Sequence, residues 1–273
     1  MWLKIPILCI LLLWILEGTA QLATPLPNGH AHNDYEKPWS PLTTALKHGF
    51  VSVEIDVFPY KGKLKVAHVG LFLGAVKDIE TLYFKPLEAW IKEHGQLFKD
   101  PQQRVIFMVD IKQDGAKAYQ LLRNLCEQYK HLVTHYDVQQ DTMIYGCVDM
   151  LLSGHKPYQQ VLEDSLRYMR IDGSLDKINH SQYTAAIAPR VSARYGSLFK
   201  WRGKGRMPEV ELNQLRKIIA QAHADNRKVR FWAMPNKEAV WKLLLDEGVD
   251  WMNVDQLERF RSFYENYKLN DKE

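Results

Sequence analysis

Short apolar runs alternate with longer amphipathic segments along most of the chain. The runs are rich in Val, Ile and Phe, as buried strands are, and the segments between them repeat apolar residues at helical spacing. Strands are predicted to end at 30–33 and to cover 51–57, 64–67, 104–111, 142–147, 150–153, 168–171, 185–191, 228–233 and 250–254. Helices are predicted between Ser40 and Gly49, over 78–94, 116–129, 159–165, 209–224 and 238–247, and in the tail after 257.

This alternation of strand and helix, repeated about eight times, implies a parallel sheet. A chain of this length favours a closed (β/α)8 TIM barrel, in one domain, over an open sheet, since such barrels take about 250 residues. Of the runs 142–147 and 150–153, the second is expected to be the barrel strand. Barrel enzymes build their sites at the carboxyl ends of strands. Polar residues gather at or near these predicted ends: His30, Asp56, Asp110, Asp172, Arg190, Trp232 and Asp255.

The first 20 residues resemble a secretory signal peptide. Lys4 precedes an apolar core over 5–16, and the small residues 18–20 form a cleavage site. The apolar run is shorter than the roughly 20 residues that span a bilayer, although an uncleaved amino-terminal membrane anchor is the alternative. We therefore expect a signal peptide over 1–20, a barrel domain over 21–273, and a secreted or periplasmic protein.

The net charge of +4 is small and most basic residues are scattered, so nucleic acid is not an expected partner. The exception is the loop 200–206 (KWRGKGR), which begins at Lys200 and ends at Arg206. It is either a solvated loop or a contact to an anionic substrate or a membrane surface. Beyond the signal only Cys126 and Cys147 remain, which allows one disulfide or two unpaired buried thiols.

Three acidic residues lie on the predicted strands. Glu54 and Asp56 are two residues apart, so both point to one face of an otherwise apolar strand. Asp110 ends the next strand, and Lys112 follows on the same face. A buried acid pair is costly unless a cation neutralises it, and oxygen ligands suit Mg²⁺ or Ca²⁺. One divalent cation is predicted at Glu54, Asp56 and Asp110. Lys112 either balances these acids or holds a phosphate oxygen, and a merely structural Asp110–Lys112 salt bridge is the alternative.

Histidines supply candidate proton-transfer groups beside these acids. His68 follows the predicted hairpin strand 64–67, and His30 and His32 lie at the end of the first strand. The pattern does not separate His30 from His32, and one of them is expected to pack or to support the other. His30 and His68 would serve as general base and acid on either side of a phosphorus. The predicted substrate contacts are Lys112, Arg190 and Trp232, with a place in the core as the alternative for Trp232.

The motifs GHAHN, EID, AH and DIK resemble the superfamily of phospholipase-C-like phosphodiesterases, which includes glycerophosphodiester phosphodiesterases and sphingomyelinase D enzymes on (β/α)8 barrels. More closely, HAHNDY, DIK, RVS, FKWRGKGRMP, RFWAMP and GVDWMNVDQL resemble the altered inheritance of mitochondria protein six family. The resemblance implies that His30 and His68 are catalytic and that Glu54, Asp56 and Asp110 bind metal. It also implies that Asn33, which completes the pattern Gly-His-x-x-Asn, is a substrate contact. The chain departs from the common His-Arg-Gly opening at Ala31 and His32, and Val69 replaces the acid that usually follows the second histidine.

These observations predict a metal-dependent phosphoric diester hydrolase. Its substrate is expected to be a glycerophosphodiester or a phospholipid headgroup. A non-catalytic barrel that binds a partner and a lyase that forms a cyclic phosphate are the two alternatives.

Overall fold

The computed structural model describes residues 22–36, 40–178 and 183–270. Within these residues, eight parallel strands close into a barrel because β1 pairs with both β12 and β2. Their order is β1-β12-β11-β10-β9-β7-β4-β2, which confirms the predicted TIM barrel. The barrel strands are β1 (Leu26–Ala31), β2 (Phe50–Tyr60), β4 (Val105–Ile111), β7 (Val148–Gly154), β9 (Met169–Ser174), β10 (Arg190–Arg194), β11 (Lys228–Trp232) and β12 (Trp251–Val254).

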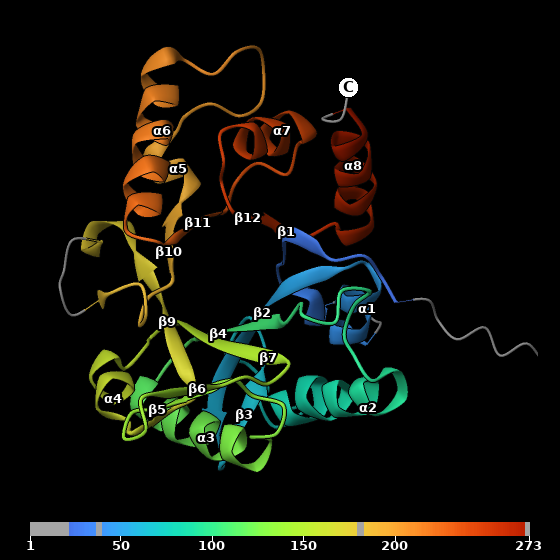
Figure 1. Ribbon diagram of the computed structural model, residues 1–273, viewed down its shortest axis with the longest axis vertical. Helices are drawn as coiled ribbons and strands as arrows, with labels where there is room; N and C mark the ends of the chain where they lie inside the picture. The colour runs from blue at the N-terminus through green and yellow to red at the C-terminus, as the bar shows by residue number, and fades with distance from the viewer. Residues whose placement is uncertain (1–21, 37–39, 179–182, 271–273) are drawn as a thin grey trace, which may run out of the picture.

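Helices surround the strands on the outside of the barrel (Figure 1). They are α1 (Pro41–Lys47), α2 (Lys85–His94), α3 (Gly115–Gln128), α4 (Tyr158–Glu163), α5 (Tyr195–Leu198), α6 (Glu209–Ala224), α7 (Glu238–Asp246) and α8 (Leu257–Asn270). Single turns lie at η1 (Asp34–Glu36) and η3 (Leu175–Lys177), and a π-helical turn, η2 (Glu80–Phe84), leads into α2. Between β9 and β10, the described residues contain η3 where the other units have a longer helix.

The two faces of β2 explain how it carries acids. Residues 50–59 are all buried. Val51, Val53, Ile55 and Val57 belong to the hydrophobic core, and complete burial of such a branched side chain contributes roughly 1.5–3 kcal/mol. The alternate residues point into the barrel, because side chains on a strand alternate between its faces. The apolar face therefore holds the strand in place while the other face presents polar groups.

The strand β3 (Lys63–Val66) extends the sheet beyond the barrel. It pairs antiparallel with the end of β2 through a two-residue turn, with Val57 opposite Val66. This hairpin, predicted from the turn at Lys61 and Gly62, delivers His68 to the carboxyl end of the barrel. The two cysteines among the described residues are free thiols, with Cys126 buried and Cys147 half-buried, so the unpaired alternative holds for them.

The run 142–147, predicted to lead into the barrel strand, forms β6 (Thr142–Ile144) outside the barrel, in a separate antiparallel sheet with β5 (His135–Asp137) and β8 (Leu166–Arg167). The run 150–153 lies in the barrel strand β7, as predicted. One predicted strand differs from the structure. The strand predicted over 185–191 instead begins at Arg190. Pro189 precedes it, and proline has no N–H to donate to a sheet ladder. The register pairs Arg190 with Asp172 and with Lys228, so Arg190 lies at the start of its strand.

Candidate active site

The three predicted acidic ligands meet at the carboxyl end of the barrel. β2 and β4 run parallel in a register that places Asp56 opposite Asp110. Glu54 lies two residues before Asp56 on the same face of β2, farther from the carboxyl end of the strand. One carboxylate oxygen from each of the three residues lies within 4.8 Å of the others. The cluster forms because strand register, rather than nearness in sequence, aligns the acids.

Lys112 sits between two of these acids. Its Nζ lies 2.8 Å from Asp56 Oδ2 and 2.5 Å from Asp110 Oδ2. Burial alone would lower the pKa of Lys112, but the two carboxylates outweigh it and raise the pKa. Burial also raises the pKa of Asp56 above its ordinary value, against the opposing effect of Lys112.

The donor set of the acidic cluster fits a hard divalent cation. Asp56 Oδ1 is buried and has no hydrogen-bond partner among the described residues. A buried polar oxygen without a partner is costly. Together with Glu54 and Asp110 it offers the carboxylate oxygens that Mg²⁺ and Ca²⁺ prefer.

His68 is held beside the cluster by Asp56. Its Nδ1 lies 3.0 Å from Asp56 Oδ2, and 55% of its side chain is exposed. The ring lines a pocket of about 590 Å³ at the carboxyl end of the barrel. Engagement of Nδ1 by a carboxylate orients the ring and leaves Nε2 available to a substrate.

His30, the other predicted catalytic residue, lies below this pocket. It is 0% exposed, with Nδ1 2.7 Å from Ser52 Oγ and Nε2 3.2 Å from Glu54 Oε2. Burial, aided by the charge of Arg230, holds its pKa well below the ordinary value. His30 is not among the residues that line the pocket. In this structure His30 therefore contacts Ser52 and Glu54 and does not line the pocket, and its predicted catalytic role stays a prediction.

His32 occupies the pocket wall instead. Its Nδ1 lies 2.7 Å from Asp255 Oδ1, because the backbone of His32 continues the β1–β12 ladder through a bond to Val254. Burial would lower its pKa, but Asp255 and the charge of Glu54 outweigh this effect and raise it. His30 and His32 share a face, and the later residue of a strand lies nearer the carboxyl end. That position along the strand explains why His32 lines the pocket and His30 does not.

Arg230 is a site residue that the sequence prediction missed. It is 3% exposed and lines the base of the pocket. Its guanidinium lies 3.0 Å from Glu54 Oε2 and 3.4 Å from Asp172 Oδ2, and its Nε donates to Asn253 Oδ1 at 3.1 Å. Burial would raise the pKa of Glu54, but Arg230 and His30 outweigh it and lower the pKa. The sequence held one indication that Arg230 faces the pocket, because Arg230 lies two residues before Trp232 and therefore on the same face of β11.

Lys156 is a second cation that the prediction missed. It lines the pocket and donates to the backbone carbonyl of Asp172. Burial lowers the pKa of Lys156 despite the nearby carboxylates of Asp172 and Asp110. Lys112, Lys156 and Arg230 together give the pocket three cationic groups around the acids.

The four predicted substrate contacts divide into two pairs. Lys112 and Trp232 line the pocket, and Trp232 is 42% exposed. Arg190 does not reach it, because it starts β10 and lies inside the barrel against Ser52 and the ring of Trp251. Burial lowers the pKa of Arg190 to about 9. Asn33 is also buried outside the pocket lining, where its Oδ1 accepts from Tyr35 at 3.2 Å.

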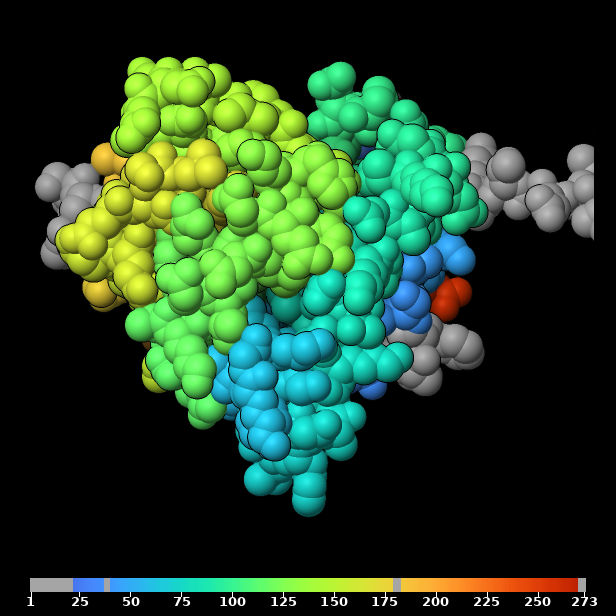
Figure 2. Space-filling view, turned by 90° about the horizontal axis from the view of Figure 1, so that it is seen from below, coloured from blue at the N-terminus to red at the C-terminus, as the bar shows by residue number. Residues whose placement is uncertain are grey.

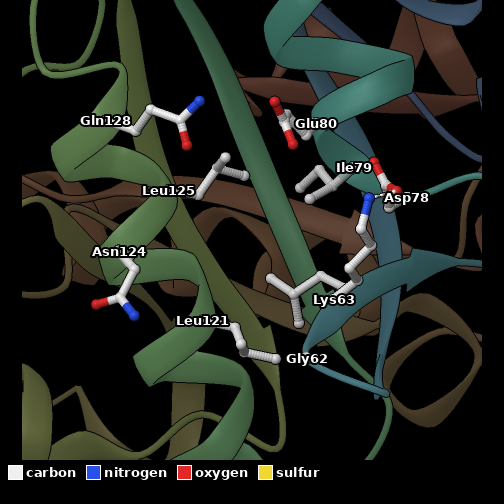
Figure 3. Close-up of a pocket in the computed structure, with 10 residues that line it drawn as sticks. Gly62, Lys63, Asp78, Ile79, Glu80, Leu121, Asn124, Leu125 and Gln128 are labelled. Carbon is white, nitrogen blue, oxygen red and sulfur yellow. Dashed lines mark hydrogen bonds and ion pairs between the residues drawn. The ribbon is translucent and has the colours of Figure 1, made fainter.

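A second hollow shows how the His68 hairpin is anchored (Figure 3). It lies between α3 and β3, and Lys63 and Asp78 face each other across its edge at 3.0 Å. Asp78 also accepts from the backbone N–H and the hydroxyl of Thr81. The Lys63–Asp78 contact at its edge joins β3 to the segment that leads into η2, and none of the candidate catalytic residues lines this hollow.

Comparison with known proteins identifies the family. The family model described as "AIM6-like phosphodiesterase domain" matches residues 20–172, which is more than half of the chain. The chain belongs to this family. It is 26% identical to Altered inheritance of mitochondria protein 6 of Eremothecium gossypii, over 86% of this chain and 68% of that protein. The Saccharomyces cerevisiae protein of the same name is 29% identical, over 85% and 69% respectively.

Solved structures agree with the barrel. The chain is similar to a glycerophosphodiester phosphodiesterase from Agrobacterium tumefaciens, with a TM-score of 0.51, 15% identity and coverage of 88% of this chain and 100% of that one. A glycerophosphodiester phosphodiesterase from Parabacteroides distasonis gives a TM-score of 0.53, with 14% identity and coverage of 88% and 98%. At these identities the likeness supports the fold. With the family match, it makes this protein a phosphodiesterase-like TIM-barrel domain.

The predicted secreted or periplasmic location is corrected by these relatives. They are fungal proteins whose name refers to the inheritance of mitochondria, which does not fit a periplasmic or exported protein. The expected signal peptide over 1–20 lies outside the described residues. Among the residues that the structure describes, no helix has the length and apolar character needed to cross a membrane.

Proposed function

We propose that this protein is a metal-dependent phosphoric diester hydrolase that acts on glycerophosphodiester-like or phospholipid-headgroup-like substrates. The observation that carries the proposal is one pocket lined by two carboxylate-held histidines, two of the three clustered acids and three cations. Such a set can bind a phosphate monoanion and can move protons on either side of it.

Glu54, Asp56 and Asp110 would hold one divalent cation, Mg²⁺ or Ca²⁺. When bound, the cation would stabilise negative charge that develops on the phosphoryl oxygens. Lys112 and Arg230 add positive charge from the protein, and Lys112 keeps Asp56 and Asp110 from repelling each other. The pocket therefore suits an anionic group next to an acidic cluster.

We assign proton transfer to His32 and His68 in place of the predicted pair His30 and His68. His68, oriented by Asp56, would take a proton from the attacking water. His32 would give a proton to the leaving oxygen, because Asp255 favours its protonated form. His30 would act as a positioning residue that holds Glu54. After one reaction His68 is protonated and His32 is neutral, and loss of a proton from His68 to solvent and gain of a proton by His32 from solvent restore the starting state.

The test is hydrolysis of bis-p-nitrophenyl phosphate and of glycerophosphodiesters with Mg²⁺ or Ca²⁺. His32→Ala and His68→Ala should each lower kcat by about 10²-fold or more. His131→Ala is the control, because that exposed ring pairs with Glu88 and does not line the pocket. Activity that survives chelation with EDTA would refute the metal, and full activity in both pocket variants would refute the proton-transfer roles. Phosphorus NMR of the product distinguishes hydrolysis from formation of a cyclic phosphate.

A further inference from the structure

An exposed apolar loop follows directly after His68. We define the apolar loop as residues 69–76, with the sequence VGLFLGAV. Phe72 is 85% exposed, Leu71 67% and Val69 57%, while Leu73 is buried and anchors the loop. Figure 2 shows the cyan segment that contains this loop projecting at the lower edge of the molecule. Contiguous exposed apolar side chains on a projecting loop indicate a contact surface.

Hydrogen bonds join the two ends of the apolar loop, so its tip is held in a fixed position. Val66 N donates to Lys77 O at 3.0 Å, and Lys65 Nζ donates to Val76 O at 2.7 Å. The Lys63–Asp78 pair lies just outside these bonds. These contacts hold both ends of the loop against β3 and leave Leu71 and Phe72 at its tip.

Phe72 is also held in a costly backbone conformation. Its φ is +55°, in the left-handed region that a bulky residue rarely adopts. Backbone strain of this kind lowers the stability of the folded protein, and it is found most often at ligand-binding and other functional segments. Glycine would fit the backbone here without that cost. The stability of the isolated fold therefore does not explain a phenylalanine at this position, because glycine would adopt the same backbone with less strain.

The charge around the apolar loop indicates what it contacts. Residues 57–77 contain four lysines and no Asp or Glu. Lys63 is paired with Asp78 and Lys65 donates to Val76 O, so Lys61 and Lys77 are the exposed lysines that remain without these contacts. Apolar side chains flanked by lysines match an anionic lipid surface, where the side chains enter the interface and the lysines meet the headgroups. On the other wall of the pocket, exposed Trp232 lies under the guanidinium of Arg194, which adds an aromatic and a cation to the same rim.

We propose that the apolar loop docks on a bilayer that contains anionic lipid, with Leu71 and Phe72 entering the interface. Because the loop begins at His68, docking would turn the mouth of the pocket toward the lipid headgroups. Resting on the proposed function, this selects a phosphodiester in a membrane lipid as the substrate class. The predicted membrane contact of the loop 200–206 is a separate surface and stays a prediction.

The test is sedimentation of the purified chain with vesicles of phosphatidylcholine, with and without phosphatidylserine. The wild type should bind the anionic vesicles. Leu71→Ser/Phe72→Ser should lower its partition coefficient by about tenfold or more, since each lost apolar side chain removes a large part of the burial. The matched control is Ile144→Ser/Tyr145→Ser, which removes exposed apolar side chains beside β6, before the start of β7 and away from the pocket.

Phe72→Gly separates docking from folding. It should leave the Tm unchanged or raised, because it relieves the positive φ, and should still weaken vesicle binding. No vesicle binding by the wild type, or equal losses in the loop and control variants, would overturn the proposal. A monomer–dimer change in the loop variants would also overturn it, in favour of a second copy as the partner.

Activity measurements keep this proposal apart from the proposed function. If both hold, Leu71→Ser/Phe72→Ser retains hydrolysis of soluble bis-p-nitrophenyl phosphate and loses hydrolysis of vesicle lipid. If the protein hydrolyses no phosphodiester but binds vesicles through the loop, docking stands and the proposed function fails. Equal hydrolysis of vesicle lipid by wild type and loop variant would overturn docking alone.

Discussion

Substitution of Arg230 by methionine tests the electrostatic arrangement beneath the pocket. Arg230 is almost fully buried and lies within 3.0 Å of Glu54 and 3.4 Å of Asp172. Methionine keeps much of the volume and removes the charge. In protein treated with EDTA, so that no divalent cation is bound, Glu54 then retains only His30 as a cationic or donor partner among its described contacts. A buried carboxylate that loses its cation is expected to destabilise the fold more than the lost packing does.

The magnitude follows from burial. Removal of one partner from a buried ion pair costs about 3–5 kcal/mol in the free energy of unfolding. For a chain of this size, 1 kcal/mol corresponds to roughly 2–4 °C in Tm, so Arg230→Met should lower the Tm by about 6–20 °C at neutral pH. Arg216→Met is the matched control, because Arg216 pairs with Glu247 at 2.6 Å while half exposed. Its loss should be below about 1 kcal/mol.

The pH dependence gives the sharper outcome. In the wild type the pKa of Glu54 is lowered, so its stabilising contribution is present above the unfolded pKa and is lost as the pH falls through the folded pKa. Without Arg230, burial raises the pKa of Glu54 instead, and its protonation relieves the variant as the pH falls. The difference in unfolding free energy between the two proteins should therefore shrink from pH 7 toward pH 4.

Urea denaturation followed by tryptophan fluorescence, at pH values from 7 to 4, measures the free energy of unfolding and its pH dependence. Thermal unfolding measures the Tm. Glu54→Leu combined with Arg230→Met should recover part of the loss, because no charge then remains unpaired at that contact. The reasoning would be refuted by an Arg230→Met protein as stable as Arg216→Met. It would also be refuted by a difference that grows as the pH falls.

Two further predictions concern the pocket. Asp255→Asn removes the partner that raises the pKa of His32, so the limb of the kcat/KM profile that reports the protonated acid should move to lower pH; an unshifted limb would contradict the role of His32. Gly154→Ala would place a Cβ 2.4 Å from Asp110 Oδ1 and 2.3 Å from Ile111 O, and should cost about 1–3 kcal/mol by thermal unfolding. Gly205→Ala, at a similar positive φ but with open space around it, should cost about 1 kcal/mol or less, and equal losses at the two glycines would show that the contact with Asp110 is unimportant.

Much of the acidic site was predictable because it follows from strand periodicity. Glu54 and Asp56 share a face at a spacing of two, and so do Asp110 and Lys112. Once the strands are parallel and in register, these residues must meet at the carboxyl end. His68 was predictable for the same reason, since a two-residue turn returns the hairpin to the level of Asp56.

Which of His30 and His32 lines the pocket depends on the depth of each residue in the barrel. That depth is set by how β1 is staggered against β2 and β12, which pair His30 with Ser52 and Asn253. Periodicity shows the face that a side chain occupies and says nothing of its height. Arg190 was misplaced for a related reason, because Pro189 shifted the start of its strand.

The order of apolar and polar residues determined the alternation of strands and helices and the face on which each acid lies, since these depend on local spacing, and the length of the chain favoured a closed barrel. Only the tertiary structure decided that Arg230 pairs with Glu54 across 176 positions of sequence, that His32 meets Asp255, and that His30 is enclosed. Those contacts join strands distant in the chain, and their distances depend on the stagger of the whole barrel, which no local pattern encodes.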